Sequence, residues 1–270
     1  MNIAEGEPQR NIDRVCELLN SCACVQGSVV CLPELVNTGF DYEAIARLEE
    51  RDAEVFLDSL AEIARKYGIW LVGGSIAEAR GDLRMNTTYD FAPTGEIVGS
   101  YTKVHLFPLI PERDRFLAGS NLRVVDFEGL AVGNAICYDL RFPELFRSLM
   151  LDGASLCVVP AQWPRMRADA WRTLSIARAI ENQFYMLACN RAGFDRDGAE
   201  YGCSLIVDPW GNVIAEADGS EEVVLSAEFD LDRVTKERAS LPALNDRRPE
   251  VYRLDWGMAG DSIVNGYSDV

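Results

Sequence analysis

The chain has 270 residues and a formal net charge of −17, from 43 acidic against 26 basic side chains, and it contains a single histidine. It shows no cluster of Lys and Arg for nucleic acid and no apolar run of the roughly 20 residues that span a membrane. A single histidine excludes a His-rich metal site. Residues 1–8 are polar and acidic rather than signal-like. We therefore expect a cytoplasmic protein with reduced cysteines, no cofactor or metal, and no nucleic-acid or membrane partner.

The apolar pattern predicts helices and strands along most of the chain. In chain order we expect a helix at 8–23, a short strand-like run at 28–32, a helical region at 43–67, strands at 69–75, 85–91 and 96–102, a hairpin of 122–127 and 130–136, a helix at 143–151, a strand at 156–159, a helix at 168–183, strands at 184–189, 204–207, 213–217 and 223–229, and a helix at 230–238. This order predicts an α/β fold in which helices cover sheets. Since no linker divides the chain, we expect one domain over 1–270, with 241–270 as a carboxyl-terminal tail.

Three predicted strands end on chemically reactive side chains. Glu34 follows the run 28–32, Lys103 follows the strand 96–102, and Cys137 ends the strand 130–136. Reactive groups gather at the carboxyl ends of strands in sheets covered by helices. Cys137 also lies just before the helix that Pro143 begins, where the helix dipole favours a thiolate. The sequence therefore predicts one site that contains a carboxylate, an ammonium and a thiol.

The motifs around these residues resemble the nitrilase superfamily of carbon–nitrogen hydrolases, in order and at plausible spacing over nearly all of the chain. The matching segments are Leu32-Pro33-Glu34-Leu35 with Thr38-Gly39-Phe40, Tyr101-Thr102-Lys103-Val104-His105-Leu106, residues 136–144 around Cys137, Ala177-Arg178-Ala179-Ile180-Glu181-Asn182-Gln183, Asp208-Pro209-Trp210-Gly211-Asn212 and residues 246–252. The resemblance implies a four-layer α-β-β-α sandwich. Members usually have an apolar strand before the segment that matches residues 2–8, so the first strand of the sandwich is expected to be missing here.

The resemblance also implies a mechanism and an assembly. Cys137 would attack an amide carbonyl, Glu34 would move protons, and Lys103 with the backbone N–H of Tyr138 would face the oxyanion. Glu112 occupies the place of a second glutamate that would steady the lysine. Residues 142–151, 168–183 and the tail from Leu241 would form the interface of a homodimer or a higher homo-oligomer.

Substrate selection is expected from loops that follow the strands. Phe40 is one candidate substrate-binding residue, and Trp163 could form the wall of a small pocket. Arg167, Arg165 or Arg141 could hold a substrate carboxylate by paired hydrogen bonds. The segment around Gln162-Trp163-Pro164 is most similar to the ω-amidase branch of the superfamily. That similarity implies hydrolysis of small 2-oxo diacid monoamides such as 2-oxoglutaramate.

Other interpretations stay open from the sequence. The same mechanism serves hydrolases of N-carbamoyl amines and of aliphatic amides. His105 could pair with Cys137 as in a cysteine protease, although its position two residues past Lys103 argues against this. A silent scaffold would need none of Glu34, Lys103 and Cys137. A thiol-redox protein could use Cys137, or Cys22 with Cys24, a pair that could also bind a metal.

Overall fold

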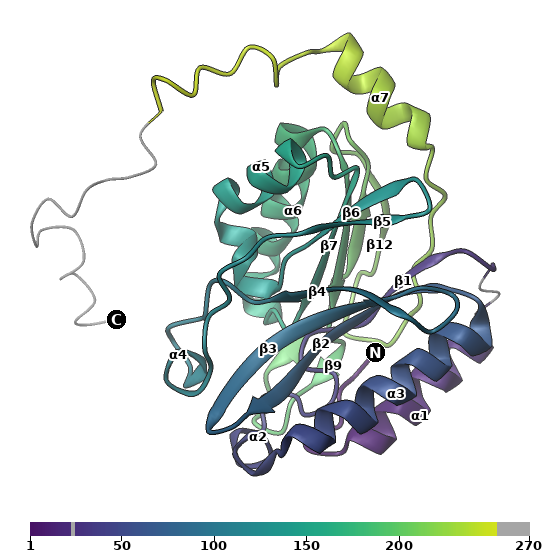
Figure 1. Cartoon of the computed structure of the whole chain (residues 1–270), viewed down its shortest axis with the longest axis vertical. Coiled ribbons are helices and arrows are strands. Elements are labelled where there is room, and N and C mark those ends of the chain that lie inside the picture. The colour runs from purple at the N-terminus through teal and green to yellow at the C-terminus, as the bar shows by residue number, and fades with distance from the viewer. Residues whose placement is uncertain (23–24, 253–270) are drawn as a thin grey trace, which may run out of the picture.

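The computed structural model describes residues 1–22 and 25–252 (Figure 1). The helices are α1 (Pro8–Ser21), α2 (Tyr42–Arg47), α3 (Glu50–Tyr67), α4 (Glu112–Arg115), α5 (Pro143–Leu151), α6 (Ala168–Asn182) and α7 (Leu231–Ser240). The strands are β1 (Val29–Cys31), β2 (Trp70–Arg80), β3 (Leu83–Phe91), β4 (Ile97–Thr102), β5 (Val124–Phe127), β6 (Leu130–Asn134), β7 (Leu156–Ala161), β8 (Tyr185–Asn190), β9 (Gly193–Phe194), β10 (Glu200–Tyr201), β11 (Leu205–Val207) and β12 (Val213–Glu216). Residues 23–24 and 253–270 lie outside this description, and with them Cys24 and most of the predicted tail.

The strands form two main sheets. The first has the order β1-β2-β3-β4 and the second the order β12-β11-β8-β7-β6-β5, while β9 and β10 make a separate ribbon. Strands β1 and β2 are parallel, as are β6, β7 and β8, and the remaining pairs are antiparallel. The parallel strands point the chain segments after β1, β6 and β7 toward one end of the sandwich.

The sheets lie face to face with helices outside them (Figure 1). Helices α1 and α3 pack on the first sheet through buried side chains such as Phe56, and α5 and α6 pack on the second through Phe146 and others. Between the sheets, Trp70 stacks on Phe127 with ring centroids 4.5 Å apart. Neighbouring strand residues face opposite layers because side chains alternate along a strand. The predicted four-layer α-β-β-α sandwich is therefore confirmed.

Local sequence signals explain where the helices begin and end. Pro8 and Pro143 each open a helix, where the missing N–H carries no cost. The predicted region 43–67 is two helices, because Asp41 caps α2 and the Asp52 carboxylate accepts the Glu49 N–H at 2.8 Å at the start of α3. Helix α3 ends at Gly68, whose φ of 63° suits glycine.

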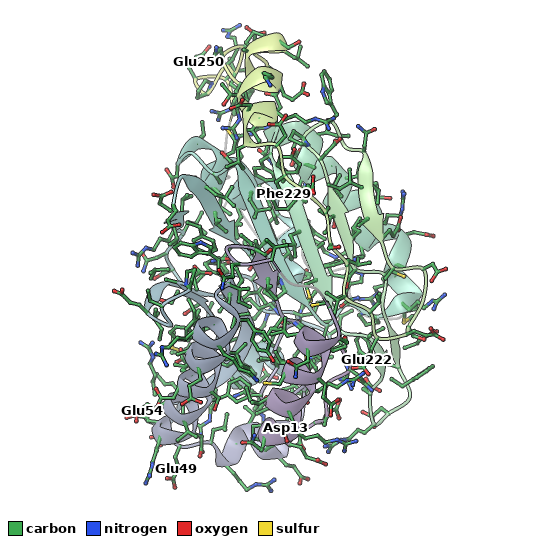
Figure 2. The ribbon with its side chains drawn as sticks, turned by 90° about the vertical axis from the view of Figure 1, so that its right-hand side faces the viewer. Asp13, Glu49, Glu54, Glu222, Phe229 and Glu250 are labelled. Atoms are coloured by element: carbon green, nitrogen blue, oxygen red, sulfur yellow. The ribbon has the colours of Figure 1, made fainter. Side chains whose placement is uncertain are left out.

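The predicted strand at residues 223–229 is wrong, because this segment pairs with no strand in the described chain. It runs from Glu222, which binds Arg14 of α1 at 2.7 Å, to Phe229, whose ring lies 4.6 Å from that of Tyr185 (Figure 2). Residues 1–7 form no strand either. A strand needs a neighbour whose backbone shares its hydrogen bonds, and none of the described strands is paired with residues 223–229.

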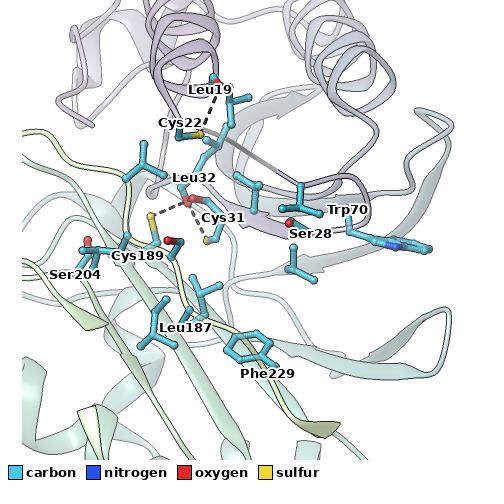
Figure 3. Close-up of a pocket in the computed structure, with 18 of the residues that line it drawn as sticks. Leu19, Cys22, Ser28, Cys31, Leu32, Trp70, Leu187, Cys189, Ser204 and Phe229 are labelled. Carbon is cyan, nitrogen blue, oxygen red and sulfur yellow. Dashed lines mark hydrogen bonds between the residues drawn. The ribbon is translucent and has the colours of Figure 1, made fainter. Parts of the chain in front are cut away.

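A cavity of about 1200 Å³ separates residues 223–229 from the outer edge of β1 (Figure 3). Its wall includes Leu19 of α1, Leu187 of β8 and the thiols of Cys31 and Cys189. Cys189 Sγ donates to the Cys31 carbonyl oxygen at 3.3 Å. The β1 edge therefore stands open along this cavity, on the side away from β2.

None of the described helices combines the length and the hydropathy that crossing a bilayer requires.

Candidate active site

The centre of the site is an ion cluster buried between the sheets. Lys103 Nζ lies 2.8 Å from Glu34 Oε1 and 2.7 Å from Glu112 Oε1. All three residues have an exposed fraction of 0%. The structure therefore brings three of the four predicted catalytic side chains into direct contact. Along the chain, Lys103 is 69 residues from Glu34 and 9 residues from Glu112.

Neighbouring backbone groups hold the two carboxylates in place. Glu34 Oε2 accepts the Gln162 N–H at 2.9 Å, and the Gln162 side chain donates back to the Glu34 carbonyl at 2.9 Å. Glu112 opens the short helix α4 rather than lying in a plain loop, and its Oε2 accepts the Phe107 N–H at 2.7 Å. The Asn86 amide donates to both, at 3.0 and 3.2 Å. Each carboxylate is thus oriented by donors besides the lysine.

Burial and charge act in opposite directions on the ions of this cluster. Burial lowers the pKa of Lys103, but the carboxylates of Glu34 and Glu112 outweigh it and raise that pKa well above its ordinary value. Burial raises the pKa of Glu112. The Lys103 ammonium lowers this pKa in part, and the charge of Glu34 raises it further. The Lys103 ammonium between two carboxylates therefore stays cationic.

Cys137 lies against this cluster at a strained turn. It follows β6, begins the short 3-10 helix Cys137–Arg141 and is 8% exposed. Its φ of 47° is in the left-handed region, which non-glycine residues adopt with strain of order 1–3 kcal/mol. Burial, and then the charge of Glu34, raise the pKa of the Cys137 thiol well above its ordinary value, while Lys103 pulls that pKa down. The thiol is therefore neutral at neutral pH and Glu34 is positioned to take its proton.

A cluster of aromatic side chains lies directly after the nucleophile in the chain and around its turn. The Tyr138 ring meets Phe107 edge-on at 5.0 Å and Phe142 at 5.3 Å, and the Arg167 guanidinium lies 5.6 Å from the Phe107 ring centroid. The guanidinium of Arg141 lies 4.9 Å from the ring of Trp163. Two predicted substrate-binding arginines thus lie over aromatic rings near the Cys137 turn.

The arginines differ in their partners. Arg165 is bound to Glu200 at 2.9 Å, whereas no carboxylate within residues 1–22 and 25–252 forms an ion pair with Arg141 or Arg167. Trp163 is 4% exposed, and its indole N–H donates to the Arg167 carbonyl at 2.9 Å, which fixes that loop. Phe40 packs in a separate cluster with Leu35 and Phe116. An unpaired guanidinium is available for an anionic ligand.

The side chain of His105 contacts Asp139 and Phe142 rather than the nucleophile. Its Nδ1 lies 2.8 Å from Asp139 Oδ1, and its ring stacks on Phe142 at 3.6 Å. No hydrogen bond joins it to Cys137 in the part of the chain that the structure describes. The Cys–His pair that the sequence left open is therefore not the arrangement found.

Three residues of the site were not anticipated from the sequence. Gln162 and Asn86 hold the carboxylates, and the hydroxyl of Tyr42 is buried without a hydrogen-bond partner among the described residues. Burial, followed by the charges of Glu112 and Glu34, raises the pKa of Tyr42, so this hydroxyl lies close to the cluster. Gln162 had a detectable signal, since it directly follows a buried strand. Asn86 and Tyr42 had none.

In the described residues, no group of three or more His, Cys, Asp and Glu side chains is arranged to hold a metal ion. Cys22 donates to the Leu19 carbonyl at 3.5 Å, and its predicted companion Cys24 lies outside the described residues.

A neutral thiol beside a carboxylate and an ammonium, at the strand ends of an α-β-β-α sandwich, defines the class of hydrolases with a cysteine nucleophile. The family described as carbon–nitrogen hydrolase matches residues 1–239. A 2-oxoglutaramate amidase of Bacillus subtilis (strain 168) is 38% identical over 251 residues, covering 93% of this chain and 96% of that protein. Omega-amidase NIT2 of Xenopus tropicalis is 33% identical over 254 residues, covering 91% and 92%.

A solved amidase from Nesterenkonia sp., in which acrylamide has added to the active-site cysteine, superposes with a TM-score of 0.79. That match covers 90% of this chain and 96% of the other at 26% identity. The chain belongs to the carbon–nitrogen hydrolase family, and the predicted resemblance to the nitrilase superfamily is confirmed. It is an enzyme of that family's kind, an amidase with a cysteine nucleophile.

The charges around Cys137 predict opposite effects of two substitutions on its thiol. Glu34→Gln removes the charge that raises the thiol pKa, so alkylation by iodoacetamide at pH 8 should speed up about tenfold, the equivalent of one pKa unit. Lys103→Met removes the opposing charge and should slow it. Mass spectrometry of the Cys137 peptide gives the rates. The internal control is the partly exposed Cys203, whose pKa burial raises without any influence of Glu34 or Lys103. Equal Cys137 rates in both variants would contradict this electrostatic arrangement.

Proposed function

We propose that this protein hydrolyses the terminal amide of small 2-oxo diacid monoamides, as an ω-amidase. The observation that carries the proposal is the buried contact of Lys103 with Glu34 and Glu112 beside Cys137, with unpaired arginines near the same turn. Identity to a 2-oxoglutaramate amidase over nearly the full chain supports the substrate class.

The first half of the reaction forms a thioester. Cys137 Sγ attacks the amide carbon while Glu34 takes the thiol proton, and the carbonyl oxygen becomes an oxyanion facing Lys103 Nζ and the Tyr138 N–H. Collapse of this tetrahedral species breaks the C–N bond. Glu34 gives its proton to the departing nitrogen, so ammonia leaves and the acyl group stays on sulfur.

The second half hydrolyses the thioester. Glu34, again a carboxylate, takes a proton from water as the water oxygen attacks the thioester carbon. The C–S bond breaks, the carboxylic acid product is released, and the proton on Glu34 returns to the Cys137 sulfur. Lys103 remains cationic throughout, since Glu34 and Glu112 raise its pKa. Glu112 holds the lysine in place while Glu34 changes charge.

Ammonia release from purified enzyme tests the proposal. We expect rapid release from 2-oxoglutaramate and 2-oxosuccinamate, slower release from an aliphatic amide, and a loss of about 10⁴-fold or more in Cys137→Ala, as for other nucleophile removals. An N-carbamoyl amine would also yield carbon dioxide, which distinguishes that alternative. Preference for a neutral amide or a carbamoyl compound would contradict the 2-oxo acid assignment while keeping the mechanism. Silence on the whole panel would contradict both.

The substrate carboxylate predicts a specific role for the arginines. In the double variant Arg141→Met/Arg167→Met, kcat/KM for 2-oxoglutaramate should fall about 10- to 100-fold, the worth of a charge-assisted hydrogen bond. The kcat/KM for a neutral amide should not change. The two single variants show how much of the loss on 2-oxoglutaramate is due to Arg141 and how much to Arg167. Arg165→Met is the matched control, since Arg165 is already bound to Glu200. An equal loss on charged and neutral amides would argue against carboxylate recognition.

We also propose that the protein forms a homodimer through α5 and α6. These helices are neighbours, with Arg147 Nη2 donating to the Glu181 carbonyl at 2.6 Å. Leu151 on α5 is 55% exposed and Ile180 on α6 is 50% exposed. Apolar side chains exposed on adjacent helices are typical of an interface. The cytoplasmic location and the part that the tail from Leu241 plays in this interface stay predictions.

Light scattering should therefore give twice the mass of one chain. Ile180→Asp places a charge in the interface and should shift the protein toward single chains. Phe194→Asp is the matched control, because Phe194 is 55% exposed and lies on β9, away from both helices. A single-chain mass for the wild type, or equal behaviour of the two variants, would contradict the proposed interface.

A further inference from the structure

The conformation of Cys137 requires support from the groups that surround its turn. Its φ of 47° carries strain of order 1–3 kcal/mol, and such a conformation persists only where the surroundings fix it. The turn must also hold the sulfur at a set distance from Glu34 and Lys103, which follow β1 and β4 of the other sheet. The carboxylate of Asp139, two residues after the nucleophile, is hydrogen-bonded both to this turn and to the chain segment that carries Lys103.

Asp139 has an exposed fraction of 0%, and both of its oxygens are occupied. Oδ2 accepts the Ile136 N–H at 2.9 Å and the Tyr101 hydroxyl at 2.7 Å. Oδ1 accepts the His105 backbone N–H at 2.9 Å and lies 2.8 Å from His105 Nδ1. A buried carboxylate with this many donors is strongly fixed, and each donor is fixed in turn.

These bonds join the two chain segments that carry the reacting groups. Ile136 directly precedes Cys137, while Tyr101 and His105 flank Lys103 on either side. Tyr101 and His105 lie 38 and 34 residues before Asp139 along the chain. The carboxylate therefore links the end of β4 to the turn after β6. A single side chain is therefore bonded to both segments.

Two further contacts close the network. The Tyr101 hydroxyl accepts the Val104 N–H at 3.2 Å, and the His105 ring stacks on Phe142 with an interplanar angle of 6°. Burial and the neighbouring Asp139 raise the pKa of Tyr101 well above its ordinary value, so its hydroxyl remains a donor at all working pH values. The network is thus complete in the resting enzyme and does not involve the substrate.

We infer that Asp139 is a positioning residue, which holds Cys137 in its strained turn and in register with Lys103. This inference rests on the proposed thioester mechanism for its effect on turnover, but the geometry of the thiol can be measured without any substrate. Asp139 does not touch the reacting atoms. It acts through Ile136, Tyr101 and His105, and loosening it should misplace the sulfur by a fraction of an ångström.

The test compares two buried aspartates that make the same number of bonds. Asp208 is 1% exposed, and its oxygens accept from Trp210 N, Asn212 N, Asn212 Nδ2 and the Arg233 guanidinium, in the turn between β11 and β12. Asp139→Asn and Asp208→Asn each lose one acceptor oxygen of a four-bond network. Melting temperatures report the structural cost in each, and kcat and KM on the best substrate report the chemistry.

We expect Asp139→Asn to lower kcat more than about tenfold with KM within about twofold, since misplacement by 1 Å can cost about 100-fold. Asp208→Asn should keep kcat and KM at wild-type values whatever its melting temperature. In Asp139→Asn the pH midpoint of Cys137 alkylation should also fall toward the ordinary value of about 8.5 as water enters the loosened turn. In Asp208→Asn the alkylation profile should match wild type.

Tyr101→Phe keeps the test decisive if Asp139→Asn does not fold. It removes one hydroxyl and should lower kcat several-fold and shift the alkylation midpoint in the same direction. Together with Asp139→Asn, the loss should be smaller than the product of the single losses, because both act on one network. Wild-type kcat and an unchanged alkylation profile in either folded variant would overturn the inference. If no substrate is found, the alkylation profiles still decide it, and only the proposed function fails.

Discussion

The buried contact of Lys103 with Glu34 and Glu112 is the constraint on which the rest of the site depends. Three ionisable groups without solvent contact are costly to bury unless each is paired and hydrogen-bonded. The molecule meets this requirement with donors from β3, from the loop after β7 and from the segment before α4. Those donors come from both sheets, so the two-sheet packing and the ion cluster require each other.

The same cluster explains why the nucleophile can be a neutral thiol. A cysteine activated only by a cation would be ionised, and it would be exposed to oxidants and other electrophiles. Here burial, and then the charges of Glu34 and Glu112, raise the pKa of Cys137. In the proposed mechanism the proton leaves the sulfur when the attack on substrate begins, with Glu34 as its acceptor. Strain in the turn at Cys137 and the Asp139 network add a geometric constraint to this electrostatic one.

Particular elements and residues show which features of the structure could be predicted from the sequence. The helix at Pro143–Leu151 has the predicted bounds, because a proline start and an apolar periodicity are local signals. The strand expected at 223–229 did not form, because pairing depends on a neighbour rather than on the residues themselves. Asn86 was missed for the same reason, since nothing in its amide side chain indicates which distant carboxylates it will orient, whereas Gln162 could have been noticed because it directly follows a buried strand. The four predicted catalytic residues remain predictions as to role, although their positions agree with it.

The sequence by itself determined the class of chemistry, because a nucleophile, a base and a cation each follow an apolar strand and carry motifs of one family. Its apolar patterns also determined an α/β fold in which helices cover sheets, and the resemblance to the family specified the four-layer sandwich. Only the tertiary structure decided that Arg165 is bound to Glu200, that His105 faces Asp139, and that a left-handed φ brings the sulfur to Glu34. These are contacts between residues far apart in the chain. Their geometry is fixed by packing of both sheets at once, which no local pattern specifies.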